Sequence, residues 1–151
     1  MMTKSLYDPS SVQEMLGRIE KITPQNQRQW GTMDVSQMLA HCANVFDMAI
    51  GKINPPRALI GRLIGGFFRT AYTNDKPFSK GSPTSDQLKV TAPRNFDTEK
   101  PRLLASLKHF AEAGEAGCTK HPHPFFGKLT ASEWSRGMYK HLDHHLQQFE
   151  G

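Results

Sequence analysis

Residues 130–149 read TASEWSRGMYKHLDHHLQQF, and the order of apolar and polar side chains in this stretch predicts one long helix. Thr130 and Glu133 have the spacing of a capping box, in which the two side chains satisfy free backbone N–H groups of the first turn. One face of this helix carries, at intervals of three and four residues, Trp134, Met138, His141, His145, Gln148 and Phe149. We expect this mixed apolar and histidine face to pack inside a helical protein.

Two further helices are predicted near the start of the chain. The first has Asp8 as its N-cap and Pro9 at its first helical position, and it should stop before Pro24. The second follows Asp34, which can form a capping box with Gln37, and it should run to about residue 50. Its apolar residues recur at helical spacing, so this helix should also bury one face.

The middle of the chain is less regular. A short apolar segment, Arg57–Tyr72, is interrupted by three glycines and predicts an irregular helix. The next segment, Thr73–Phe96, is a long excursion with at most a short strand around Leu88–Val90, and loops of this length often act as lids. Another helix should follow Asp97 and end near Gly114.

These elements predict an all-α protein. Four main helices, with the long crossover excursion between the second and third, fit an antiparallel four-helix bundle in which residues 1–151 form a single domain. Only two cysteines occur, Cys42 and Cys118, which is too few for a disulfide scaffold and is typical of a reducing compartment. The first residues lack the apolar stretch of a secretory signal, so we expect a cytoplasmic protein.

The formal charge of +5 raises the question of anionic partners. The basic residues are spread from Lys4 to Lys140 without a long run, and no nucleic-acid-binding motif accompanies them, so we expect a solvated basic surface and no nucleic acid. The most apolar stretch, Ala58–Phe68, is about half the length of a membrane span and carries Arg62 in its middle. It should not cross a bilayer, and we expect no membrane partner.

The histidines of the last helix point to a metal site. His141 and His145 are four residues apart, so their imidazoles project from successive turns, about 6 Å apart along the helix axis. A tightly bound divalent ion needs further ligands, and His41, on the margin of the apolar face of the second helix, is the obvious third donor. The competing interpretation is that HxxxH arises by chance and that His41 is an ordinary hydrogen-bonded core residue. Three neutral imidazoles would leave the ion's charge available to lower the pKa of a metal-bound water towards about 7, the pattern of a catalytic site.

Three other polar residues are candidates for the surroundings of the ion. Gln148 follows His145 by three residues and could hydrogen-bond a ligand imidazole. His144 lies at the flank of the same face and could replace a ligand or support one. His123 could close over the site or simply cap a turn.

Two longer stretches carry a family resemblance. WGTMDVSQMLAHC, ending in His41 and Cys42, and HPFFGKLTASEWSRGMYKHLDHHLQQF at residues 123–149 together resemble the DinB-like superfamily of metal-binding four-helix bundles, and most closely a bacterial branch of unknown function. The resemblance implies an up-down-down-up bundle whose metal ligands map onto His41, His141 and His145. It also implies zinc or nickel as the ion, low-molecular-weight thiols such as bacillithiol or mycothiol as co-substrates of transferases and isomerases, and a homodimer.

Three functions follow from these observations. The leading hypothesis is a metal-dependent enzyme, a thiol-dependent transferase or a hydrolase, acting on a small electrophile under the long loop. The alternative is a non-catalytic metal- or ligand-binding module with a stress-related role. A third is an interfacial protein led to an anionic surface by Arg57, Arg62 and Arg69, which we place last because these residues make only a ragged basic face.

Overall fold

The computed structural model describes residues 4–80 and 88–150, and the regular elements within these ranges are helices, as the all-α prediction expects. The elements in chain order are α1 (Pro9–Lys21), α2 (Val35–Ala49), α3 (Leu59–Thr73), α4 (Phe96–Ala113), the short 3-10 helix η2 (Glu115–Gly117) and α5 (Ala131–Phe149). The β-structure of the described residues is a single bridge between His123 and Gly127. None of the described helices has both the length and the apolar character that a membrane crossing requires.

The helix starts confirm the predicted caps. Asp8 accepts a hydrogen bond from the Ser10 amide at the start of α1. Complete capping boxes open α2 at Asp34 and α5 at Thr130. Helix α4 starts slightly earlier than predicted, because the Asn95 side chain accepts from the Thr98 amide and so acts as the N-cap.

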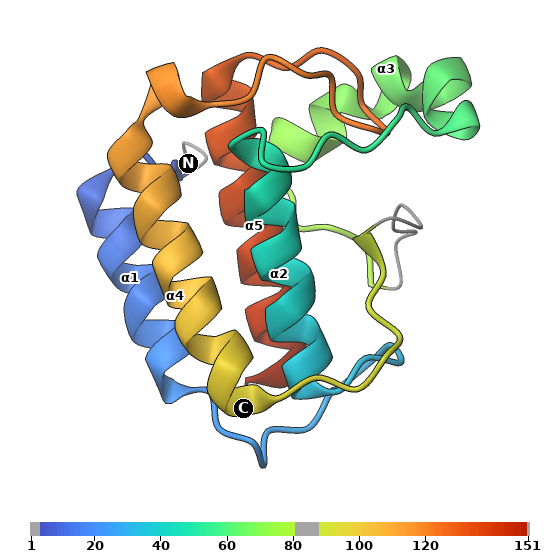
Figure 1. The fold of residues 1–151 in the computed structure, drawn as a ribbon. Coiled ribbons are helices and arrows are strands. Elements are labelled where there is room, and N and C mark those ends of the chain that lie inside the picture. Colours follow the sequence, from blue (N-terminus) through green and yellow to red (C-terminus); the bar gives the residue numbers. More distant parts are fainter. Residues whose placement is uncertain (1–3, 81–87, 151) are drawn as a thin grey trace.

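The core lies between α1, α2, α4 and α5. Helix α2 packs against α4 and α5, and α1 packs against the same two helices. In Figure 1, α1 and α5 run downwards, whereas α2 and α4 run upwards. The largest fully buried side chains include Trp134, Phe46, Phe110, Phe149, Met15, Met38 and Leu39. This arrangement places the inner face of α5 directly beside α2.

Helix α3 differs from the prediction of an irregular helix, because it is continuous over 15 residues. Its glycines do not interrupt it; they allow close packing. A Cβ atom on Gly65 would lie 1.7 Å from the carbonyl oxygen of Phe125, and one on Gly61 would lie 2.6 Å from the same atom. The Ala58 amide also donates to the Pro124 carbonyl, at 2.9 Å. The α4–α5 loop therefore lies against α3, which also packs on α5.

The prediction allows at most a short strand around Leu88–Val90, and in the structure these residues form no strand. Leu88 and Val90 are buried, so their apolar side chains serve as anchors for an irregular segment. The predicted lid, Thr73–Phe96, begins with the last residue of α3 and includes residues 81–87, which lie outside the described residues. That this segment closes over a site stays a prediction.

Two adjacent glycines of α3 provide a matched test of this packing. Gly65→Ala should lower the free energy of unfolding by about 1–3 kcal/mol, because the new methyl group would collide with the backbone of Phe125. Gly66→Ala should raise it by about 0.5–1 kcal/mol, because a Cβ there has nothing within 4 Å and alanine is the better helix former. Urea unfolding followed by circular dichroism measures both, and equal effects would contradict the proposed contact.

Candidate metal centre

The three predicted ligand residues meet between α2 and α5. His41 lies in the middle of α2 and is almost fully buried, and it faces His141 and His145 on α5. The Nε2 atoms of His41 and His141 are 3.0 Å apart. One ligand nitrogen from each of the three residues can be chosen so that all lie within 4.8 Å of one another. Side chains a hundred residues apart in sequence therefore form one histidine cluster.

The orientation of His41 is set by a backbone group. Its Nδ1 atom lies 2.7 Å from the carbonyl oxygen of Leu88. A carbonyl can only accept, so Nδ1 carries the proton and donates it to Leu88. The unprotonated Nε2 of the neutral ring then faces the cluster, which is the state a metal ligand needs.

His145 is oriented in the same way by Gln148. The Nδ1 atom of His145 lies 2.8 Å from Oε1 of Gln148, and the Gln148 amide nitrogen donates to the carbonyl of Trp30 at 2.7 Å. Because the amide nitrogen is used by Trp30, its oxygen must accept from His145. Gly31 leaves space for the Gln148 side chain: its φ is +82°, and a Cβ there would lie 2.6 Å from the Gln148 side-chain nitrogen. The free nitrogen of His145 is again Nε2.

The arrangement fits a divalent ion. Two unprotonated nitrogens at 3.0 Å repel each other unless a proton or a cation lies between them. Two nitrogens at about 2.0–2.1 Å from a tetrahedral zinc ion are roughly 3.3 Å apart, so a small opening of the pair accommodates the ion. Without an ion, His141 must carry its proton on Nε2 and donate to His41.

The electrostatics favour neutral rings. Burial, together with the nearby His41, lowers the pKa of His145 to about 3. Burial also lowers the pKa of His41, and burial together with the neighbouring His145 and His41 lowers that of His141 well below 6.5. Neutral imidazole is the form that binds metals, so these rings are ready to bind at neutral pH without losing a proton to solvent.

The other two predicted histidines lie outside the cluster. The His144 ring is 5.2 Å from that of His145, and it contacts Trp30 and Phe78 on its other sides, with centroids 5.4 and 6.0 Å away. His123 caps a turn: its Nδ1 accepts from the amides of Phe125 and Phe126 at 3.1 and 3.2 Å. Of the two roles considered for His123, the structure therefore shows the turn cap.

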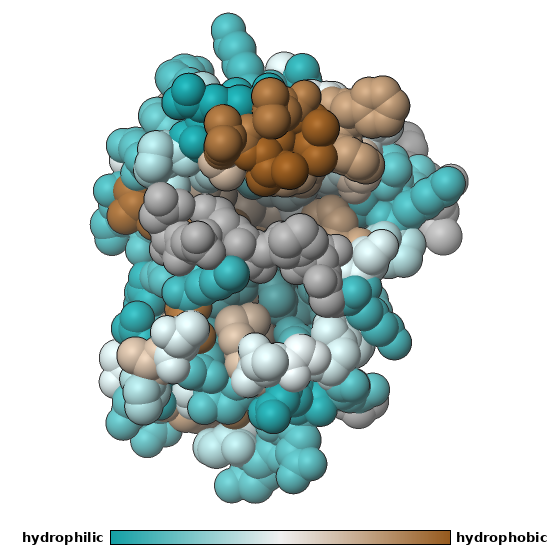
Figure 2. Space-filling view, turned by 90° about the vertical axis from the view of Figure 1, so that its right-hand side faces the viewer, coloured by the Kyte–Doolittle hydropathy of each residue, from teal (hydrophilic) through white to brown (hydrophobic). Residues whose placement is uncertain are grey.

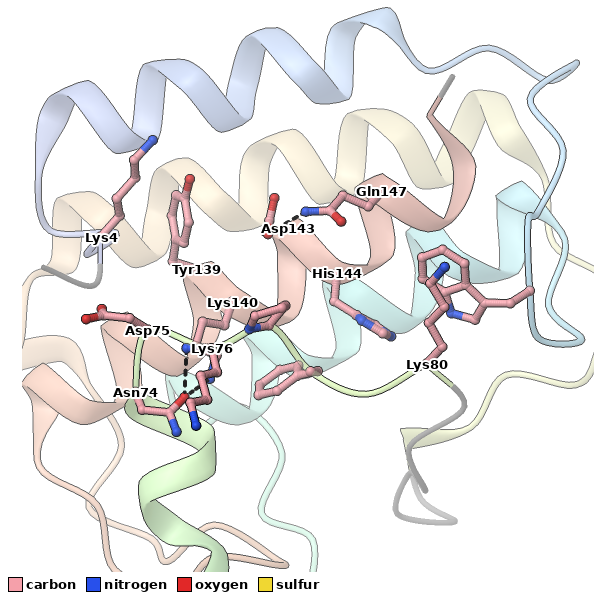
Figure 3. Close-up of a pocket in the computed structure, with 13 residues that line it drawn as sticks. Lys4, Asn74, Asp75, Lys76, Lys80, Tyr139, Lys140, Asp143, His144 and Gln147 are labelled. Atoms are coloured by element: carbon pink, nitrogen blue, oxygen red, sulfur yellow. Dashed lines mark hydrogen bonds between the residues drawn. The ribbon is translucent and has the colours of Figure 1, made fainter. Parts of the chain in front are cut away.

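A cavity of about 460 Å³ lies beside His144 (Figure 3). Its lining residues include four lysines, Lys4, Lys76, Lys80 and Lys140, and two carboxylates, Asp75 and Asp143, together with the aromatic residues Trp30, Phe78 and Tyr139. The ammonium groups of Lys80 and Lys140 lie 4.7 and 4.6 Å from the ring centroids of Trp30 and Phe78.

The lysines give this cavity a net positive lining. Asp143 forms an ion pair with Arg18 at 2.7 Å, although Arg18 also pairs with Glu150 at 2.8 Å, and Lys4 pairs with Glu14 at 2.7 Å. Lys140 donates to the Ala71 carbonyl and to Asn74, and burial lowers the pKa of Lys140 to about 8. Lys76, Lys80 and Lys140 therefore outnumber the carboxylate of Asp75 in the lining. The cavity suits an anionic group with an apolar or aromatic body.

Sequence reasoning missed the backbone partners of the cluster. The carbonyls of Leu88 and Trp30 fix two imidazoles, but every residue has a carbonyl, so the sequence carries no signal for them. The lysines of the cavity were missed for a related reason. Lys76 and Lys80 lie in the segment after α3 and Lys140 lies in α5, and only the fold brings these two regions together.

Comparison with known proteins identifies one family. The family model described as "Protein of unknown function (DUF1569)" matches residues 3–151, nearly the whole chain. No curated protein and no solved structure matches the chain.

The buried His123 ring provides a test of the pH dependence of stability. Burial and the nearby Arg57 lower the pKa of His123 to about 3, from 6.5 in the unfolded chain. Between these values the unfolded state binds more protons, so the stability of metal-free protein should rise with pH from about 3 to 6.5 and then level off. His123→Asn keeps an acceptor for the two loop amides but removes the proton site. It should reduce the slope by up to about 1.4 kcal/mol per pH unit in urea unfolding, and an unchanged slope would show that His123 is not held neutral.

Proposed function

The chain belongs to the DUF1569 family of proteins of unknown function, and we propose that it is a metal-dependent enzyme whose single divalent ion is held by His41, His141 and His145. The observation that carries this proposal is the convergence of three neutral imidazoles, two of which have their Nδ1 protons committed to Leu88 and Gln148. A purely structural role for these histidines would not require two pinned rings with their free nitrogens facing the same point.

Three protein ligands favour a catalytic over a structural ion. Structural zinc sites more often have four protein ligands rich in cysteine, and the two cysteines of this chain lie elsewhere. The Cys42 thiol points to Met38, 3.8 Å from its sulfur, and burial raises the pKa of Cys42. When bound, a divalent ion supplies a Lewis acid that lowers the pKa of a water or thiol and polarises a carbonyl.

The directions of the helices support the resemblance to DinB-like proteins. With α1 and α5 opposite in direction to α2 and α4, the chain fits the up-down-down-up bundle expected for that superfamily (Figure 1). We therefore also propose zinc or nickel as the ion and a low-molecular-weight thiol as one reactant. In this proposal the enzyme transfers the thiol to a small electrophile. In the hydrolase form of the proposal, water attacks the electrophile instead of the thiol.

The cavity beside His144 is the proposed substrate site. Its volume of about 460 Å³ suits a small molecule. Lys76, Lys80 and Lys140 would bind an anionic group of the substrate, and the rings of Trp30 and Phe78 would hold its apolar part. His144 lies between this cavity and the ligand His145, so its ring would position the substrate relative to the cluster.

One observation supports a second candidate function. The lining of the cavity includes His144 but none of the three clustered histidines. A ligand bound in this cavity would not need to contact the ion. This is what is expected of a non-catalytic metal- or ligand-binding module. The two candidates differ in whether turnover depends on the ion.

Metal content and metal-dependent turnover test the proposal together. Protein purified without an affinity tag should contain about one zinc or nickel ion per chain by elemental analysis, and His41→Ala should lose it because two imidazoles bind weakly. His109→Ala, at an exposed histidine of α4, is the matched control and should keep the ion. A screen of thiols with small electrophiles should give turnover that chelation abolishes and added metal restores.

The outcomes separate the two candidates. Metal without turnover across the screen favours the binding module. Two results contradict the metal centre itself. One is wild-type protein that contains no metal after gentle purification, and the other is His41→Ala protein that still contains about one ion per chain.

Two adjacent glutamines test the support of His145. Gln148→Leu should weaken metal binding by about 10–100-fold, because the Nδ1 proton of His145 loses its acceptor. The His145 ring is then no longer held in the orientation that points Nε2 at the cluster. Gln147→Leu is the control, since the exposed Gln147 side chain donates to Asp143 and not to a histidine of the cluster within the described residues. Competition with a chromophoric chelator measures both affinities, and equal affinities would remove Gln148 from the site.

A further inference from the structure

The outer face of α3 is the most exposed apolar surface among the described residues. Phe67 is 88% exposed, Leu59 76% and Leu63 75%, and three further large side chains on this helix, Ile60, Ile64 and Phe68, are also exposed. Figure 2 shows them as one brown patch in the upper part of the molecule. Six large apolar side chains on one short helix are more than solitary surface residues, and such patches mark interaction sites.

The inner face of the same helix is already occupied. Gly61 and Gly65 lie against the backbone of Phe125, and the buried Tyr72 lies against Gly137 of α5. Arg69 forms an ion pair with Glu133 at the start of α5, with its Nε 2.7 Å from the carboxylate. Helix α3 is therefore fixed to the rest of the protein by one face while its opposite face is open to solvent.

The charged side chains of α3 and of the segment directly before it have one sign. From residue 48 to residue 74 the sequence contains no acidic residue and four basic ones, Lys52, Arg57, Arg62 and Arg69. Lys120 and Lys128 are exposed on the α4–α5 loop, which lies alongside α3. The exposed cations on α3 and the segments next to it are thus Lys52, Arg62, Lys120 and Lys128, whereas Arg57 donates to backbone carbonyls and Arg69 pairs with Glu133.

We propose that α3 docks this protein on an anionic lipid surface, lying in the plane of the interface with Leu59, Leu63 and Phe67 among the acyl chains. An amphipathic helix with large apolar residues on one face and basic residues at its border is the form that binds such interfaces. Fifteen residues are too few to span a bilayer, so the helix lies on the membrane rather than across it. This inference is independent of the histidine cluster.

Charge complementarity decides between a lipid surface and a second copy of the chain. A symmetric contact between two α3 faces would bring Arg62 and its basic neighbours of both copies together, with no acid in residues 48–74 to offset them. Phosphate headgroups present the opposite charge. The sequence alone ranked this surface last because its arginines are scattered, whereas the structure shows that exposed apolar side chains form it and the basic residues only border it.

Vesicle flotation with the full chain tests the proposal. Wild-type protein should float with vesicles of phosphatidylcholine and phosphatidylglycerol and bind phosphatidylcholine alone at least about tenfold more weakly, with binding reduced by salt. The double variant Leu63→Asp with Phe67→Asp should lose binding by at least about tenfold, and it should still fold because both side chains are exposed. Ala105→Asp with His109→Asp introduces two aspartates at the same spacing on an exposed face of α4, and it should bind like wild type.

Three results would overturn the proposal. The first is wild-type protein that does not float with anionic vesicles, and the second is a Leu63/Phe67 variant that still floats. The third is a wild-type dimer in light scattering that the same variant converts to monomer while vesicle binding is absent, which would assign the face to a second copy. Circular dichroism of both double variants shows whether they are folded, so loss of binding cannot be mistaken for loss of structure.

Discussion

Three neutral imidazoles facing one point between α2 and α5 are the constraint on which the rest of the site depends. Two unprotonated nitrogens 3.0 Å apart repel each other unless a proton or a cation lies between them, so the positions of the imidazole protons decide what the cluster can bind. The Leu88 carbonyl and the Gln148 amide place two of these protons, and Trp30 and Gly31 in turn hold Gln148. The loops before α2 and α4 are thus part of the centre although they supply no ligand to it.

The sequence predicts the parts of this structure that depend on local signals. Side-chain caps at Asp8, Asp34 and Thr130 mark helix starts correctly because the cap and the amides it binds are neighbours in sequence. The histidine cluster is predictable because four-residue spacing places His141 and His145 on one face of a helix. The roles of groups that depend on distant contacts are not predictable in this way.

Helix α3 and the Leu88 segment show this limit. Gly61 and Gly65 weaken the helical signal, and only their contact with Phe125, sixty residues further on, explains why glycine is present and the helix continuous. Leu88 and Val90 alternate like strand residues, but they bury their side chains in an irregular segment whose carbonyl serves His41. Asn74 also joins two regions, since it caps the end of α3 and accepts from Lys140 at the cavity.

The separation of His41 from His141 along the chain has a consequence for biosynthesis. A nascent polypeptide emerges with His41 a hundred residues before His141, so the histidine cluster cannot assemble until α5 has left the ribosome. Helices α1, α2 and α4 can begin to associate earlier, but the cluster acquires its second and third imidazoles only after α5 has emerged. A chain that terminates before α5 therefore retains one imidazole of the cluster and cannot form the three-nitrogen group.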